Sequence, residues 1–395
     1  MAKGIIVSDT HLGDYSYGWL DPETGLNTRF LDFLSNLDES IDFAIDKKVD
    51  FFFVAGDIYR NKHPSSKIRK QFAPRIKKLI QNDIRVMLMT GNHDMTTSAD
   101  GAHSMSEIEE LSDLIDGLEV YSSPTVVKID KKTELYILPY VNRGDQNLLT
   151  VQELLQFQIS KIKEFNEKTH ESNIVNKLFF GHFGTDKSIV GGSFDLDMSD
   201  DENENIVKLD TFKEGDWCKV YLGHIHRQQE FNKVCRHVGS IGRVDFAESD
   251  EEKGFYFYDD GDDEFVSVKD RTFKVFDLKL DSDHKEKIED FIKKLKNIDL
   301  SNAIVKVKID IKQTYYSIAK FELIENYLKE NSWHSVGLNF NVIPDQIDKE
   351  VALITTEDSP NDALRKYIEK NKGRFENIEE ETYKVGCETL KSCIN

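Results

Sequence analysis

The sequence predicts an α/β domain followed by a smaller α+β domain. Up to residue 140, short apolar runs alternate with segments in which apolar residues recur every three or four positions. The runs are expected strands and the periodic segments are expected amphipathic helices, an alternation typical of βαβ units around a parallel sheet. The expected strands in this part are Gly4–Ser8, Phe51–Ala55, Val86–Met89 and Leu135–Tyr140.

Helical periodicity fills the gaps between these strands. One apolar face consists of Phe30, Leu34, Leu37, Ile41 and Ile45, and a second consists of Ile68, Phe72, Ile76 and Leu79. A third helix is expected over Gln152–Glu167, and three more apolar runs follow it at Leu178–Phe180, Val220–Leu222 and Phe255–Tyr258. The acidic segment Asp195–Glu204 is expected to be a solvated loop.

The pattern changes after Arg271, which predicts a domain boundary. Charged helices are expected over Asp283–Lys296 and Tyr316–Glu330, on either side of a strand-like Ala303–Ile311. We therefore expect a main domain over 1–270, an accessory α+β domain over 271–350 and a helical segment over 351–395. In that last segment Leu364 and Ile368, with Ala363 and Tyr367 alongside, form an apolar stripe, which could pack on the chain's own smaller domain or dock on a partner.

Composition narrows the class of protein. The 395 residues contain no apolar run long enough to cross a membrane and no basic-then-apolar leader, so we expect a cytoplasmic protein without membrane association. The four cysteines form no CxxC pair, which indicates reduced thiols. A net charge of −20 argues against broad nucleic-acid binding, although a local basic surface can still bind phosphates.

Possible metal ligands follow five of the expected strands directly. The five segments are Ser8-Asp9-Thr10-His11, Gly56-Asp57, Gly91-Asn92-His93-Asp94, Gly181-His182 and Gly223-His224-Ile225-His226. Strand ends of an open α/β sheet meet at one edge, so these side chains are expected to converge. Glycine precedes the ligand in four of the five segments and permits a tight turn.

The donor types indicate two divalent cations. Carboxylate, imidazole and amide donors suit manganese, iron or zinc, and the lack of cysteine disfavours a structural zinc site. Two such ions can hold the attacking and leaving oxygens of an in-line displacement at phosphorus. Each segment alone has an ordinary explanation, such as a helix cap or a buried histidine, whereas all five together favour a dinuclear centre.

The order of these segments resembles the calcineurin-like metallophosphoesterases over roughly the first 260 residues. The flanking residues are similar to the SbcD-type nuclease subunit of the double-strand-break repair complex. The resemblance is most specific over His237-Val238-Gly239-Ser240, Arg243 to Glu248 and Lys253-Gly254-Phe255. It implies a layered α/β/β/α sandwich with a DNA-capping domain, two divalent metals (manganese above all), a homodimer and an SbcC-type coiled-coil ATPase as partner.

The resemblance also implies roles for single residues. One metal would be held by Asp9, His11 and His226, and the other by Asn92, His182 and His224, with Asp57 bridging them. His93 would act beside the scissile phosphate and be oriented by Asp94. His93 follows the ligand Asn92 directly, so we expect its ring to stabilise or protonate the departing oxygen. A further metal ligand or a support for one is the alternative.

A basic stretch begins directly after Asp57. It contains Arg60, Lys62, Lys67, Arg69, Lys70, Arg75, Lys77, Lys78 and Arg85. We expect Arg60 and Lys62 to contact DNA phosphates, while an ordinary exposed helix face remains the alternative for the later lysines.

Together these features predict a metal-dependent DNA nuclease. A phosphodiesterase or phosphatase for small substrates, and a non-enzymatic assembly subunit, remain the two alternatives.

Overall fold

The computed structural model describes residues 2–95, 102–141, 151–167, 174–189, 206–213, 215–280, 284–344, 359–370 and 379–394. The acidic segment 195–204 and the predicted boundary at residue 350 lie outside these ranges. The chain divides into two compact units. The first comprises residues 1–276, 296–307 and 324–337, and the second comprises residues 277–295, 308–323 and 338–395.

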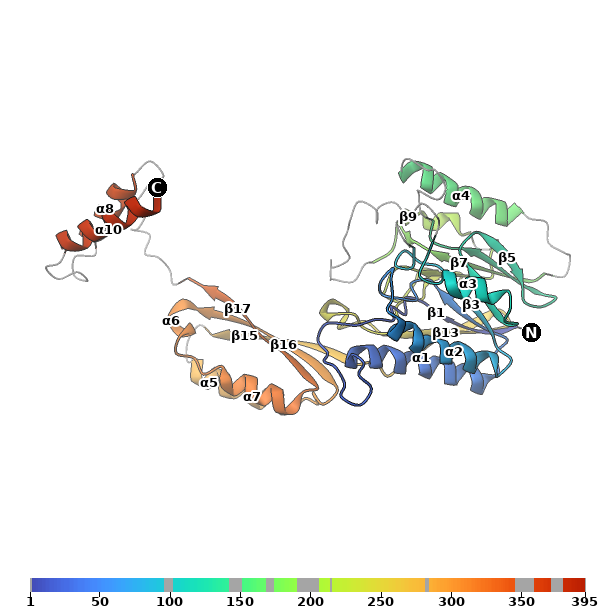
Figure 1. Cartoon of the computed structure of the whole chain (residues 1–395), viewed down its shortest axis with the longest axis horizontal. Helices are drawn as coiled ribbons and strands as arrows, with labels where there is room; N and C mark the ends of the chain where they lie inside the picture. The colour runs from blue at the N-terminus through green and yellow to red at the C-terminus, as the bar shows by residue number, and fades with distance from the viewer. Residues whose placement is uncertain are drawn as a thin grey trace. The chain divides into compact units, whose positions relative to one another are not determined.

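Two six-stranded sheets form the centre of the first unit (Figure 1). The first sheet has the order β14 (Asp262–Ser267), β13 (Gly254–Asp259), β1 (Lys3–Val7), β2 (Phe51–Ala55), β3 (Arg85–Met89) and β4 (Leu118–Tyr121). The second has the order β11 (Gln229–Glu230), β12 (Cys235–His237), β10 (Lys219–Gly223), β7 (Asn176–His182), β6 (Thr133–Leu138) and β5 (Thr125–Lys128). A small pair, β8 (Gly184–Thr185) and β9 (Ile206–Val207), accompanies them.

Helices cover the outer face of each sheet, which confirms the predicted α/β/β/α layering. Side chains of α1 (Thr28–Lys47) and α2 (Ser66–Ile80) pack in one apolar cluster with the first sheet, and α4 (Val151–Glu167) packs with the second. A third cluster lies between the two sheets. Because strand side chains alternate, Ile5 and Val7 of β1 join the helix-side cluster and Ile6 joins the central one. A short helix, α3 (Ser106–Ser112), precedes β4.

Parallel pairing places the strand ends that carry the predicted ligands at common edges. Strands β1, β2, β3 and β4 run parallel in the first sheet, and β6, β7, β10 and β12 run parallel in the second. A parallel bridge between Ser8 and Ser240 joins the end of β1 to the segment after β12. The carboxyl ends of strands from both sheets therefore meet in one region.

The remaining elements follow β14. A three-stranded sheet has the order β15 (Thr272–Leu280), β16 (Ala303–Lys312) and β17 (His334–Ile343). The helices of this part are α5 (His284–Leu295), α6 (Gln313–Tyr316), α7 (Glu322–Asn331), α8 (Pro360–Lys370) and α10 (Glu379–Ile394). The helix expected over Tyr316–Glu330 begins later in the structure, because α6 ends at Tyr316 and α7 covers only Glu322–Asn331. No helix in the described part of the chain has the length and apolarity that a membrane span requires.

Candidate metal centre

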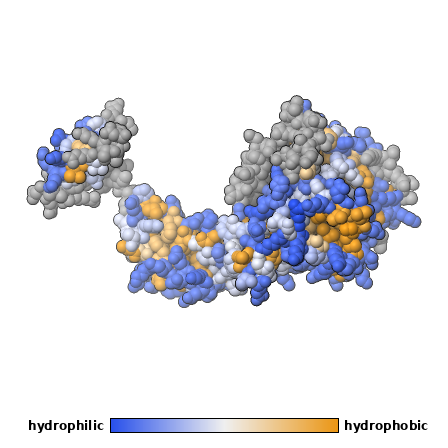
Figure 2. Space-filling model, viewed as in Figure 1, coloured by the Kyte–Doolittle hydropathy of each residue, from blue (hydrophilic) through white to orange (hydrophobic). Residues whose placement is uncertain are grey.

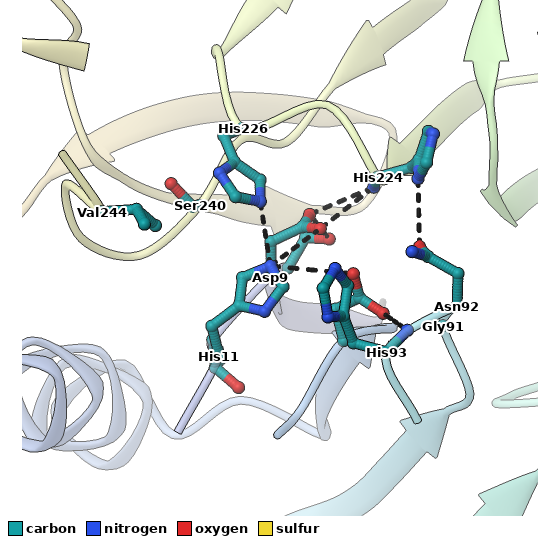
Figure 3. Close-up of polar contacts among 12 residues, drawn as sticks. Asp9, His11, Gly91, Asn92, His93, His224, His226, Ser240 and Val244 are labelled. Atoms are coloured by element: carbon teal, nitrogen blue, oxygen red, sulfur yellow. Dashed lines mark hydrogen bonds and ion pairs between the residues drawn. The ribbon is translucent and has the colours of Figure 1, made fainter. Parts of the chain in front are cut away.

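Five loops bring the predicted ligands together. Asp9 and His11 follow β1, Asp57 follows β2, Asn92 follows β3, His182 ends β7, and His224 and His226 follow β10. Asp9, Asp57 and His182 are almost fully buried. Figure 3 shows the side chains of Asp9, His11 and His226 pointing toward one another, with Asn92 facing His224.

Three overlapping groups of side chains have the spacing of metal ligands. They are Asp9, His11 and His226; His11, Asp57 and His93; and Asp9, Asp57 and His182. Within each group the candidate ligand atoms lie within 4.8 Å of one another. Asp9, His11 and Asp57 each belong to two groups, so the groups form one continuous cluster that could hold metal.

The backbone is strained where it presents these ligands. Asp9, His11, Asp57 and His224 have φ values of 48°, 40°, 52° and 82°, in the left-handed region that side chains normally avoid. Such conformations persist only where the surrounding structure enforces them. Close packing does so here, since a Cβ atom on Gly91 would lie 2.1 Å from Asp57 Oδ1.

The hydrogen bonds of His182 show why the cluster suits a cation. Its Nδ1 lies 2.9 Å from the Ala55 carbonyl oxygen, which only accepts, so Nδ1 carries a proton. Its Nε2 then faces two oxygen atoms, Asn92 Oδ1 at 3.0 Å and Asp57 Oδ2 at 3.4 Å. Burial opposes a charged ring, but the Asp57 carboxylate outweighs it and raises the pKa of His182 to about 9. A bound cation would replace the second proton of the charged ring, which is carried by Nε2.

Charge in the cluster is also arranged for metal binding. Burial alone would raise the pKa of Asp57, but the neighbouring His182 and His93 hold it well below its usual range. Burial, followed by the neighbouring His182, lowers the pKa of His224 to about 3. Asp57 is therefore ionised and His224 neutral at neutral pH, which are the protonation states that ligate metals.

A buried network behind His226 fixes its orientation. Glu248 Oε1 lies 2.8 Å from His226 Nδ1, so Nδ1 donates and Nε2 points into the cluster, 2.9 Å from His11 Nε2. The second Glu248 oxygen accepts from the Val244 amide at 2.9 Å and from Lys253 Nζ at 2.9 Å. Burial disfavours the charge on Glu248, but Lys253 and His226 outweigh it and hold the pKa of this carboxyl far below normal.

Sequence reasoning assigned no role to Glu248 or Lys253. Both stand in the stretch that most resembles the SbcD-type subunit. The only sign of a role in the sequence was that these two charged residues come shortly before the strand-like Phe255–Tyr258. Lys253 is 2% exposed and also donates to the Ser240 hydroxyl and to the His226 carbonyl. A buried lysine with this many partners stabilises the loop that carries a ligand.

The side chains of His93 and Asp94 contact different partners. The Asp94 carboxylate accepts from the backbone amides of Ile58, Tyr59 and Gly91 and from the Ser104 hydroxyl. The ring contact of His93 is instead between Nδ1 and the Arg60 carbonyl oxygen, at 3.1 Å. Asp94 thus ties together the loops after β2 and β3, while the Arg60 backbone orients the His93 ring.

Four of the nine basic residues in the predicted stretch pair with acidic residues from elsewhere in the chain. The ion pairs are Arg69–Glu107, Arg75–Asp38, Lys78–Asp42 and Arg85–Glu119. These contacts support the ordinary helix-face interpretation for that part of α2. Arg60 stacks on Tyr15, with its guanidinium carbon 4.2 Å from the ring centre, and Lys62 is exposed.

The sequence of this chain matches a family of known proteins. A sequence model of the calcineurin-like phosphoesterases matches residues 3–228. This range is more than half of the chain and contains all seven predicted metal ligands. The chain belongs to the calcineurin-like phosphoesterase family. Glu248 and Lys253 lie beyond the matched region of this phosphoesterase.

Three relatives of this calcineurin-like phosphoesterase carry the name DNA double-strand break repair protein Mre11. The one from Methanocaldococcus jannaschii is 23% identical over 361 residues, covering 88% of this chain and 86% of the relative. The one from Archaeoglobus fulgidus is 22% identical, covering 82% of this chain and 75% of the relative. The one from Halobacterium salinarum is 33% identical over 150 residues, covering 37% of this chain and 34% of the relative.

The network behind His226 gives a direct test. Glu248→Ala should weaken metal binding by roughly 10- to 100-fold, because His226 loses the partner that fixes its tautomer. The measurement is calorimetric titration of the metal-free protein with Mn²⁺. Glu252→Ala is the matched control, since Glu252 is exposed and bonds to Ser267. Equal affinity in both variants would show that Glu248 has no influence on the metal centre.

Proposed function

We propose that this calcineurin-like phosphoesterase is a metal-dependent DNA nuclease that hydrolyses phosphodiester bonds in the processing of DNA ends for repair or recombination. The observation that carries the proposal is similarity to a protein named for double-strand break repair over 88% of this chain, well beyond the phosphoesterase match. That extent favours a nuclease over a phosphodiesterase for small substrates. The intact set of ligand residues favours an enzyme over a non-enzymatic assembly subunit.

The proposed centre holds two divalent cations, with manganese as the proposed metal. Asp9, His11 and His226 hold one cation, and the grouping of their ligand atoms supports this set. Asn92, His182 and His224 hold the other, supported by the 3.0 Å and 3.1 Å distances from Asn92 Oδ1 to the two rings. Asp57 would bridge them, because its Oδ2 lies 3.7 Å from His11 Nε2 in one set and 3.4 Å from His182 Nε2 in the other.

In the proposed reaction the bound cations activate a water molecule and neutralise charge on the phosphate oxygens. The chain supplies positioning and a proton. His93 Nδ1 donates to the Arg60 carbonyl oxygen, which leaves Nε2 for the substrate. From that position the ring can stabilise or protonate the leaving oxygen. The His93 amide donates to Asp57 Oδ1 at 2.9 Å, so the ring and the bridging carboxylate are held on one turn.

Replacing His93 separates chemistry from metal binding. His93→Gln should lower turnover roughly 10²- to 10⁴-fold while metal content stays the same, because the ring acts in the transition state. Asp57→Ala should lose both metal and turnover. Manganese-dependent degradation of linear DNA and metal analysis of each variant make the comparison, with exposed His63→Gln as control. Loss of metal in His93→Gln equal to that in Asp57→Ala would make His93 a ligand.

Arg60 and Lys62 are the proposed phosphate contacts. Reversing both to glutamate should weaken DNA binding and lower the slope of log affinity against log salt by about 1 per residue. Hydrolysis of a small aryl phosphodiester should not change, since that substrate does not reach them. Exposed Lys70 and Lys77 on α2, reversed together, are the matched control. Equal losses for DNA and for the small substrate would mean that the two residues are structural.

A homodimer is the proposed assembly. Leu111, Leu114 and Ile115, at and after the end of α3, are 51%, 81% and 39% exposed. Figure 2 shows hydrophobic residues gathered on the face of the unit that carries α2 and α3. An apolar surface of this kind is typical of a protein contact, and a second copy placed there would bring two metal centres to one DNA end.

The partner proposed from the family resemblance is an SbcC-type coiled-coil ATPase. The predicted stripe on α8 contacts α10: a Cβ atom on Gly386 would lie 2.5 Å from Leu364, and Ile368 is 4% exposed. Tyr367 and Val385 remain 44% and 58% exposed. Tyr367 of the stripe and Val385 of α10 are the proposed anchors on the partner.

Deleting residues 359–395 should abolish co-purification with a co-expressed SbcC-type ATPase and leave manganese-dependent cleavage of single strands intact. The double change Tyr367→Asp and Val385→Asp should have the same effect without removing the helices, because both side chains are exposed. Glu380→Lys, also exposed, is the control. Full co-purification of the double variant would exclude these two side chains as anchors.

A further inference from the structure

Aromatic side chains occupy alternate positions on the segment between the ligand His11 and α1. They are Tyr15, Tyr17 and Trp19. Tyr15 is buried and its hydroxyl donates to the His11 carbonyl oxygen at 2.7 Å. Tyr17 is partly buried against Phe246, and Trp19 is 45% exposed. The segment therefore runs from the metal centre to an exposed indole.

Trp19 is held in a fixed position despite its exposure. Its amide donates to the Thr28 hydroxyl at 3.1 Å, and its carbonyl oxygen accepts from the Thr28 amide at 2.9 Å. The next residue, Leu20, forms an antiparallel bridge with Asn27, the residue that caps α1. The indole is thus anchored to the start of a long buried helix.

A second indole supports the first. The ring centres of Trp19 and Trp333 are 4.6 Å apart with the planes tilted by 31°. The Arg271 guanidinium carbon lies 3.6 Å from the centre of Trp333, and Asp32 and Asn302 hold the guanidinium at 2.6–2.7 Å. Trp333 is therefore covered by its neighbours, and the free aromatic surface belongs to Trp19.

If Trp19 served only to hold Trp333 in place, its own ring would not need to be exposed. Trp333 already has the Arg271 contact, and its amide donates to the Leu300 carbonyl oxygen at 3.2 Å. Nearly half of the Trp19 surface nevertheless faces water. Rigid exposed aromatic rings are how proteins bind single-stranded nucleic acid, because every base has a face that stacks on them.

The position of Trp19 and the positive charges near it also favour single-stranded nucleic acid as the ligand. Eight residues separate Trp19 from His11, so the two lie at most about 29 Å apart, a span that a short single strand covers. Lys306 Nζ lies 4.9 Å from the Phe246 ring that Tyr17 contacts, and Lys67 Nζ contacts the Gly25 carbonyl oxygen of the same loop. The ammonium groups of two lysines thus lie along the segment, where they are available to the phosphates of a bound strand.

We propose that Trp19, supported by Trp333 and Arg271, is a base-stacking site that holds single-stranded DNA while a phosphodiester bond of the same strand enters the metal centre. The inference rests on the proposed nuclease function and specifies the form of its substrate. A base stacked on Trp19 would fix the strand through one aromatic contact without reading its sequence.

Intrinsic fluorescence tests the site without requiring turnover. The chain has three tryptophans, and the remaining one, Trp217, is 3% exposed. Titrating the full-length protein in EDTA with an oligothymidine of about 16 nucleotides should quench its fluorescence, because the base stacks on an indole. Trp19→Phe should lose most of this quenching and keep most of the affinity.

Affinity gives the second readout, measured by anisotropy of labelled DNA. Trp19→Ala should raise the Kd for the oligothymidine roughly 5- to 150-fold and leave the Kd for blunt duplex within about twofold. Leu20→Ala is the matched control, since Leu20 is 67% exposed on the same loop. It should leave both values unchanged.

The outcomes separate this inference from the proposed function. Equal losses for single strands and duplex, or an altered melting temperature of Trp19→Ala, would make Trp19 structural and overturn the inference. Unchanged affinity of Trp19→Ala for single strands would also overturn the inference, and the exposed indole would then be a candidate contact for a protein partner. In both cases manganese-dependent cleavage by the wild type would still uphold the nuclease. Failure of the wild type to cleave or bind any DNA would reject the nuclease itself.

Discussion

The structure of the first unit depends on one constraint, the burial of two carboxylates among imidazoles. Removing Asp9 and Asp57 from water is costly unless their charge is compensated. Part of the compensation comes from backbone amides, since His224 donates to Asp9 at 3.2 Å and His93 donates to Asp57 at 2.9 Å. The rest requires protons on the histidines or cations between the side chains, and the spacing of these side chains would allow a metal ion to be held there.

The two sheets supply the rigidity that this cluster needs. Each ligand stands one to four residues beyond a strand whose side chains are packed on both faces, except His182, which is itself the last residue of its strand. Ligands on such elements are placed more accurately than ligands on long loops. The left-handed conformations of Asp9 and Asp57 are tolerated for the same reason: the strands before them cannot shift to relieve the strain.

Local patterns in the sequence were sufficient to predict the scaffold and which ligands converge. The apolar positions of α2 are the four expected ones, and β2 has the predicted bounds. Contacts between distant segments were not predictable in this way. The acidic partners of the basic stretch, such as Asp38 and Glu119, stand outside it, and no periodicity links Glu248 to His226. Short strands such as β12 also lack a pattern long enough to be recognised.

The net charge of −20 and the ion pairs on α2 together limit how the proposed nuclease would hold DNA. Counterion release, which dominates binding to duplex, requires many unpaired cations along the phosphate backbone. Four of the nine basic residues after Tyr59 form ion pairs within the chain and are therefore not available to DNA phosphates. Stacking on an aromatic ring needs no net positive charge, and cations bound at the metal centre attract the phosphate locally. An acidic chain with one exposed, rigid indole and a buried cluster of metal ligands is therefore better suited to a single strand at a DNA end than to the length of a duplex.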